Sequence, residues 1–222
     1  MRIVQASATG TAHGAALMVL LPCAYGQPED FQRHGFVAAL QHRVPNFDVM
    51  LPDAHIGYYT DGNIGELLRD DVLRPARARG YEQIWVAGIS IGGLGALGCA
   101  CDYGPDLTGV VALAPYPGTP DIVAEIEGAG GLPGWSPAAA LLAQDAERRI
   151  WHWMGARGAD ASPSVYLGFG TEDRFSRGHE LMASALSPAG VCRLPGGHDW
   201  AVWRALWQQF VDQNIFCSTV PA

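Results

Sequence analysis

The stretch that decides the fold is Gln83-Ile84-Trp85-Val86-Ala87-Gly88-Ile89-Ser90-Ile91-Gly92, near the middle of the 222-residue chain. Gln83–Ala87 is a short apolar run that predicts a buried strand, and the Ala/Leu-rich segment beginning at Ile91 predicts a helix. The strand therefore passes into the helix through one sharp turn at Ser90. The two backbones pass closely at such a turn, so side chains at positions 88 and 92 would obstruct them.

The same alternation of strand and helix extends over the rest of the chain. Six further short apolar runs predict strands: Arg2–Ser7, Ala16–Leu21, Phe47–Leu51, Gly109–Leu113, Val165–Phe169 and Val191–Leu194. Helical patterns lie between the strands: Glu29–Arg43, Ile64–Arg79, Ile91–Asp102, Gln144–Met154, His179–Leu186 and Trp200–Asn214. This order predicts an α/β fold, a three-layer α/β/α sandwich with a mostly parallel sheet.

One segment departs from this alternation. Pro115–Ala143 is rich in proline and glycine, which predicts irregular backbone or short helices inserted after the strand that ends at Leu113. We expect a single domain over residues 1–222, with a small lid-like insertion at about 115–143.

Composition excludes several classes of function. The formal charge is −8, and no basic block is present to follow a phosphate backbone, so we expect no nucleic-acid partner. All 14 basic residues are arginines. The absence of lysine excludes P-loop ATPases, which need a phosphate-binding lysine, and enzymes that form a Schiff base.

The cysteines point to a reducing compartment. They are odd in number and lack CxxC or Cys/His spacing, so we expect neither a disulfide framework nor a metal site. The five cysteines are Cys23, Cys99, Cys101, Cys192 and Cys217. The apolar run Ala15–Leu21 is too short to span a bilayer. It lacks the basic start of a secretory signal, the main alternative, so we expect a buried strand in a cytoplasmic protein without membrane contact.

Ser90 would be a weak nucleophile without a base and an orienting acid, and both occur later in the chain. Asp173 follows the strand Val165–Phe169, and His198 follows the strand Val191–Leu194. In a parallel sheet these loops open on the same edge as the Ser90 turn. The alternative reading of the turn is a glycine-rich connection with a capping serine.

Other residues compete for these roles. Glu172 is adjacent to Asp173 and is a second candidate for the orienting acid, whereas Asp199 is expected to cap the final helix. Six further histidines are present, but only His198 stands in a glycine-rich loop after a late strand.

Gly88-Ile89-Ser90-Ile91-Gly92, Asp173 and His198, in that order, resemble the α/β-hydrolase superfamily. The closing segment Pro195-Gly196-Gly197-His198-Asp199-Trp200-Ala201-Val202-Trp203 resembles small carboxylesterases related to feruloyl esterases and S-formylglutathione hydrolase. The resemblance implies the α/β-hydrolase fold and hydrolysis of small carboxylic esters through an acyl-enzyme, with no cofactor or metal. A thioesterase, a peptidase or a silent binding protein on the same scaffold are the alternatives.

The chain departs from this family at the second donor of the oxyanion hole. The amide of Ile91, at the start of a helix, is one candidate donor. Relatives usually carry a His-Gly dipeptide after an early strand, where this chain has Pro22-Cys23. Proline has no backbone N–H, so the second donor is expected to be the amide of Ala24 or, as the alternative, of Cys23.

Aromatic residues supply the candidates for substrate binding. We expect Trp135, Trp151 and Trp153 to line an acyl or aryl pocket, with Tyr25, Tyr58 and Tyr59 contributing from the same edge. Three further tryptophans recur at helical spacing, which predicts a helix that packs on the core: Trp200, Trp203 and Trp207. The short insertion favours small soluble esters as substrates. We also expect a monomer or a homodimer.

Overall fold

The computed structural model describes residues 1–7, 16–158 and 161–217, which form one seven-stranded sheet. The strand order is β1-β3-β2-β4-β5-β6-β7, with β1 antiparallel to β3 and every other pair parallel. The strands are β1 (Ile3–Ala6), β2 (Ala16–Leu21), β3 (Phe47–Pro52), β4 (Gln83–Ile89), β5 (Gly109–Leu113), β6 (Ser164–Gly170) and β7 (Val191–Leu194). All seven predicted strands are present, and the predicted α/β fold class is confirmed.

Helices connect the strands and cover both faces of the sheet. Their bounds are α1 (Asp30–Arg33), α2 (Phe36–Arg43), α3 (Ile56–Thr60), α4 (Ile64–Leu68), α5 (Arg74–Ala78), α6 (Ile91–Tyr103), α7 (Pro120–Gly128), α8 (Ala139–Gln144), α9 (Ala146–Ala156), α10 (Ser176–Ala183) and α11 (Trp200–Asp212). A π-helical turn at Arg69–Leu73 joins α4 to α5. Short 3₁₀ turns occupy Gly104–Asp106, Leu132–Gly134, Pro188–Gly190 and Ile215–Cys217.

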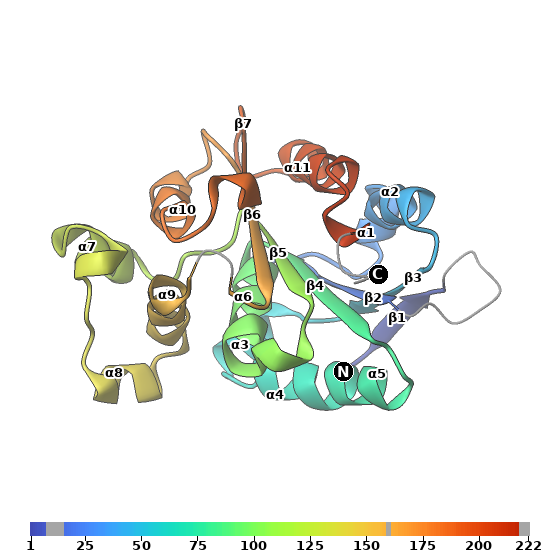
Figure 1. Cartoon of the computed structure of the whole chain (residues 1–222), viewed down its shortest axis with the longest axis horizontal. Coiled ribbons are helices and arrows are strands. Elements are labelled where there is room, and N and C mark those ends of the chain that lie inside the picture. The colour runs from blue at the N-terminus through green and yellow to red at the C-terminus, as the bar shows by residue number, and fades with distance from the viewer. Residues whose placement is uncertain (8–15, 159–160, 218–222) are drawn as a thin grey trace.

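Each face of the sheet carries its own core. Helices α4, α5, α6, α9 and α10 pack on one face, and α1, α2 and α11 pack on the other (Figure 1). Every residue of Ala16–Leu21 is buried, because β2 lies inside the sheet with helices above and below it. None of the helices in the described ranges is long and apolar enough to cross a membrane.

The structure divides one predicted helix and forms short helices in the insertion. The expected helix over Glu29–Arg43 is interrupted at Gly35, whose φ of 79° lies in the left-handed region, so two helices form instead. The segment Pro115–Ala143, expected to form irregular backbone or short helices, contains the short helix α7 and the start of α8. Pro120 stands in the first turn of α7, where its missing N–H does no harm, and Ile122 and Ile126 are buried one turn apart.

The insertion is fastened to α9 by polar contacts. The guanidinium group of Arg148, on α9, pairs with Asp121 and Glu125 of α7 and with Asp145. The indole N–H of Trp151 donates to the carbonyl oxygen of Pro117 at 2.7 Å. Because both anchors lie on α9, the position of the insertion depends on that helix.

Candidate active site

Ser90 lies in a strained turn between β4 and α6. Its φ of 57° and ψ of −116° are unusual for a residue with a side chain. A Cβ atom on Gly88 would stand 2.0 Å from the carbonyl oxygen of Gly92, so the turn requires glycine at that position. The amide of Ser90 donates to Leu113 on the neighbouring strand at 2.9 Å, and its carbonyl accepts from Tyr116 at 2.9 Å. These contacts with the β5 segment hold the strained conformation.

A continuous hydrogen-bond chain links Ser90, His198 and Asp173. The Nε2 atom of His198 lies 3.0 Å from the Ser90 Oγ, and its Nδ1 atom lies 2.7 Å from Oδ2 of Asp173. Because an ionised carboxylate only accepts, Nδ1 donates and Nε2 is left to accept the serine hydroxyl proton. The structure thus brings together the three residues that the sequence placed on separate loops.

The Asp173 and His198 loops are joined to each other through their backbones. The amide of Thr171 donates to Leu194 at 2.8 Å, and the amide of Glu172 donates to Gly196 at 2.9 Å. A Cβ atom on Gly170 would lie 2.2 Å from the Gly196 carbonyl oxygen, so the loops approach closely only because residue 170 is glycine. The relative position of the acid and the imidazole therefore depends on backbone contacts.

Aromatic rings hold the His198 imidazole on two sides. The ring of Phe175 meets it edge-on at 5.3 Å, and the ring of Trp203 does the same at 5.0 Å. Such edge-to-face contacts restrict rotation of the imidazole. The role of Phe175 was not predicted from the sequence, although its place two residues after Asp173 was a usable signal. Trp203 was expected only to pack on the core.

The structure separates the competing acids. Asp173 is 3% exposed, and its second oxygen accepts from the amide of Phe175 at 2.9 Å. Glu172 is exposed and contributes only its backbone to the loop pairing. Asp199 caps α11, since its side chain accepts from the amides of Ala201 and Val202.

Electrostatics favour the ionised form of Asp173. Burial by itself would raise the pKa of this carboxyl, but the hydrogen bonds from His198 and from the amide of Phe175 outweigh it and lower the pKa below its usual range. The carboxylate is therefore available as a fixed negative charge beside the imidazole.

The loop after β2 lies directly against the start of α6. A Cβ atom on Gly92 would lie 2.3 Å from the carbonyl oxygen of Leu21 and 2.5 Å from that of Pro22. Cys23 and Ala24 are the next residues in the chain, so this contact places them beside the first turn of α6. The amides of Ile91 and Ala24 donate to no acceptor within the described parts of the chain.

The residues expected to bind substrate differ in how far they are buried. Trp151 is fully buried and hydrogen-bonded to Pro117, so its prediction as a pocket residue is wrong. Trp135 and Trp153 are partly buried against the core, and Arg157 covers the ring of Trp153 at 5.2 Å. Tyr25 is 89% exposed.

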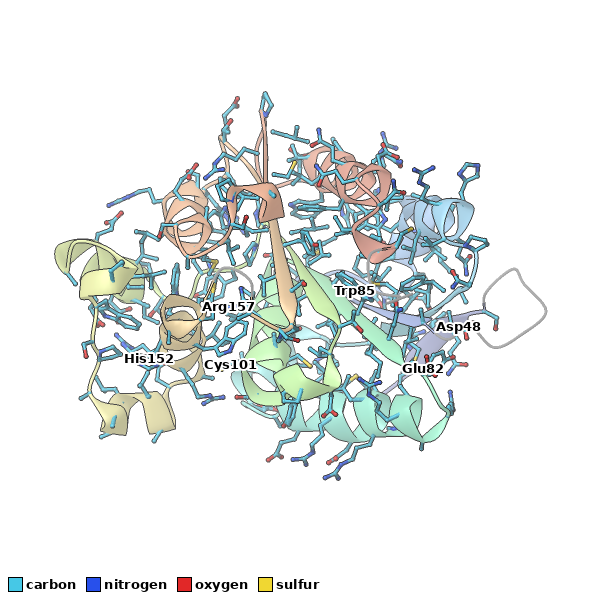
Figure 2. All side chains as sticks on the ribbon, viewed as in Figure 1. Asp48, Glu82, Trp85, Cys101, His152 and Arg157 are labelled. Carbon is cyan, nitrogen blue, oxygen red and sulfur yellow. The ribbon has the colours of Figure 1, made fainter. Side chains whose placement is uncertain are left out.

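A cavity of about 600 Å³ lies at the other end of the sheet. Asp48, Tyr81 and Glu82 line it, at the start of β3 and β4, and Figure 2 labels Asp48 and Glu82 there. The cavity lies at the start of β4 and Ser90 follows its end. The strand is about 20 Å long at 3.3 Å per residue, so it separates the cavity from Ser90 by about that distance. The cavity therefore takes no part in the hydrogen-bond chain.

Comparison with solved structures shows that the chain has the α/β-hydrolase fold expected from the sequence. S-formylglutathione hydrolase from Staphylococcus aureus has a TM-score of 0.62 and 15% identity, over 92% of this chain and 82% of that chain. The ferulic acid complex of Est1E from Butyrivibrio proteoclasticus has a TM-score of 0.62 and 14% identity, over 97% and 95%. An esterase domain from Rhodothermus marinus has a TM-score of 0.62 and 13% identity, over 96% and 98%.

A family model places the chain more narrowly. The model described as putative esterase matches residues 71–213, which is more than half of the chain. The chain belongs to this esterase family. No curated protein matches it.

Proposed function

We propose that this esterase hydrolyses small carboxylic esters through an acyl-enzyme formed on Ser90. The observation that carries the proposal is the hydrogen-bond chain from Ser90 Oγ to His198 Nε2, at 3.0 Å, and from His198 Nδ1 to Asp173, at 2.7 Å. The strained backbone of Ser90 supports it, because strain of this kind persists where a side chain must be held for chemistry.

In the first half of the reaction, Ser90 Oγ attacks the ester carbonyl carbon while its proton moves to His198 Nε2. The negative charge that develops on the carbonyl oxygen is stabilised by the amides of Ile91 and Ala24. Collapse of this tetrahedral intermediate breaks the bond to the alcohol oxygen, which takes the proton from Nε2. The products are the free alcohol and an ester of Ser90.

In the second half, water takes the place of the alcohol. His198 removes a proton from the water as its oxygen attacks the acyl carbon, and the same proton then returns to Ser90 Oγ as the acid leaves. Asp173 stabilises the imidazolium in both halves and keeps the proton on Nδ1, so that Nε2 always faces the reacting oxygen.

We also propose that the protein works in a reducing compartment such as the cytoplasm. All five cysteines are free thiols in the described residues, and burial raises the pKa of Cys99 to about 12, which keeps it protonated.

Labelling with a fluorophosphonate probe tests the role of Ser90. We expect the wild-type protein and a Ser184→Ala control to take the label and to hydrolyse p-nitrophenyl acetate, whereas Ser90→Ala does neither. Ser184 is an exposed serine on the far end of α10, which makes it a matched control. Failure of the wild-type protein to react with the probe, or retained activity in Ser90→Ala, would refute the proposal.

A further inference from the structure

A second histidine lies buried near the hydrogen-bond chain and takes no part in it. His179 is fully buried on α10, which packs beside β6, the strand that leads to Asp173 (Figure 1). Its Nε2 atom lies 2.8 Å from the carbonyl oxygen of Pro115, and because a carbonyl only accepts, Nε2 carries the proton and donates. The Nδ1 atom is then an acceptor, and it has no hydrogen-bond partner within the described residues.

The unpartnered nitrogen shows what the imidazole contributes here. A buried nitrogen without a partner destabilises a fold, so a carbon ring would fill the same space more favourably. The imidazole packs on Phe169 at 5.0 Å, a contact that a phenylalanine side chain would also make. The property that only the imidazole supplies is the Nε2 donor, so the bond to Pro115 distinguishes histidine at this position.

Pro115 begins the segment that holds the nucleophile. The amide of the next residue, Tyr116, donates to the carbonyl oxygen of Ser90 at 2.9 Å. A Cβ atom on Gly93, in the first turn of α6, would lie 3.0 Å from Pro115, so the segment also touches the helix that follows Ser90. The strained backbone of Ser90 persists only where its surroundings hold it. A displacement of Pro115 would therefore displace Ser90.

The other end of the bond lies on the helix that follows the acid loop. The amide of Ser176 donates to the carbonyl oxygen of Asp173 at 2.9 Å, and the amide of His179 donates to that of Phe175 at 3.1 Å. The Phe175 ring meets both imidazoles edge-on, with its centroid 6.4 Å from that of His179 and 5.3 Å from that of His198. His179 is thus connected to both the acid and the base.

A close contact beside His179 brings α10 against the same segment. A Cβ atom on Gly178 would lie 2.7 Å from the Cβ atom of Pro117. Glycine at this position lets α10 approach the segment, but packing against a proline ring has little directional preference. The hydrogen bond from His179 to Pro115 is directional, so it fixes where the segment rests on α10.

We propose that His179 is a positioning residue, which through Pro115 holds the Ser90 turn within hydrogen-bond distance of His198. The inference rests on the proposed function and adds a fourth side chain to its machinery. The nucleophile follows β4, whereas the acid and the base follow β6 and β7, so the β5 segment lies between them. The pairing of β5 with β6 ends at Leu113 and Gly168, and the His179 bond continues the connection beyond that point.

Three substitutions at residue 179 separate the donor from the volume of the ring. His179→Gln places an amide N–H near the position of Nε2, His179→Asn carries the same amide one carbon shorter, and His179→Phe keeps a ring without a donor. Steady-state hydrolysis of p-nitrophenyl acetate is measured at pH 8, where His179 is neutral because burial lowers its pKa below the ordinary 6.5.

We expect His179→Asn and His179→Phe to lower kcat by about tenfold to hundredfold, since a misplacement of about 1 Å between reacting groups can cost about 10²-fold. His179→Gln restores the donor, so its kcat should stay within about threefold of the wild-type value. KM should change much less than kcat in all three variants, because a fully buried side chain does not touch the substrate.

Tyr81→Phe is the matched control for the loss of a buried hydrogen bond. The Tyr81 hydroxyl donates to Asp48 at 2.6 Å in the interior, near the start of β4 and about 20 Å from Ser90. This variant should lose stability in urea denaturation but keep the wild-type kcat. Each variant is assayed where its urea curve shows it to be folded.

The outcomes separate this inference from the proposed function. A wild-type protein that does not hydrolyse p-nitrophenyl acetate refutes the proposed function. In an active wild-type protein, an unchanged kcat in folded His179→Asn or equal losses in the Gln and Asn variants overturns the positioning role alone. A similar loss of kcat in Tyr81→Phe also overturns it. If His179→Phe does not fold, the Gln and Asn variants still decide, because their amides differ only in reach.

Discussion

A Cβ atom on Gly92 would lie 2.3 Å from the carbonyl oxygen of Leu21. The last residue of β2 thus touches the first turn of α6 through backbone atoms alone. The contact joins the two segments that carry the candidate oxyanion donors, Ala24 and Ile91.

The contact predicts that Gly92→Ala is strongly destabilising. Neither backbone can retreat without moving β2 or α6, so we expect the free energy of unfolding to fall by about 2 kcal/mol or more in urea denaturation. Gly98→Ala, on the same helix, meets only the flexible end of Ile150 and should be neutral or stabilising by up to about 1 kcal/mol. Equal stabilities of the two variants would contradict this reading of the contact.

Asp173 and Glu172 can be told apart kinetically. Asp173→Asn keeps the shape of the side chain but no longer favours the proton on Nδ1 of His198, so kcat for p-nitrophenyl acetate should fall by about 10³–10⁴. Glu172→Gln is the matched control, since the Glu172 side chain is exposed, and it should change kcat less than about twofold. A large loss of kcat in the Glu172 variant would show that Asp173 is not the orienting acid.

His179 should make folding stability depend on pH. Its ring is fully buried, and Nε2 donates to the carbonyl oxygen of Pro115 at 2.8 Å. Burial lowers the pKa of His179 below its ordinary 6.5, so as pH falls below about 6.5 the unfolded chain binds a proton that the folded chain does not. Stability should therefore decrease between pH 7 and pH 5, by at most about 1.4 kcal/mol per pH unit from this group.

The matched measurement is urea denaturation of His179→Gln over the same pH range. Glutamine can keep a donor near Pro115 but cannot titrate, so the variant should show a shallower decrease. Asp173, His198 and Glu180 also act on this imidazole, and they remain in the variant. Parallel curves for the two proteins would show that another group causes the pH dependence.

Two tyrosines with buried hydroxyl groups should respond differently to the loss of those groups. The Tyr81 hydroxyl donates to Asp48 at 2.6 Å, so Tyr81→Phe should destabilise the fold by about 1.5–3 kcal/mol. The Tyr59 hydroxyl is buried without a hydrogen-bond partner in the described residues, so Tyr59→Phe should leave stability unchanged or raise it by about 1 kcal/mol. Urea denaturation of both variants checks this, and a loss in Tyr59→Phe similar to that in Tyr81→Phe would be contrary evidence.

The amino-acid sequence by itself determined the sheet and the order of the candidate catalytic residues. Strands such as Ala16–Leu21 and Gly109–Leu113 were found with their observed bounds, because runs buried on both faces are apolar throughout. Gly88 and Gly92 marked the turn at Ser90, because close backbone approach leaves no room for a side chain. The short helix α3 escaped prediction, since Ile56–Thr60 spans too few residues for a helical period to be visible.

Only the tertiary structure decided between Asp173 and Glu172 and buried Trp151. Adjacent acids look equivalent in the sequence, and the difference arises because one faces His198 and the other faces solvent. The buried indole of Trp151 donates to Pro117, 34 residues away in the chain. Local patterns depend on neighbours along the chain, whereas these features depend on packing between segments that are distant in sequence, and no local pattern encodes that packing.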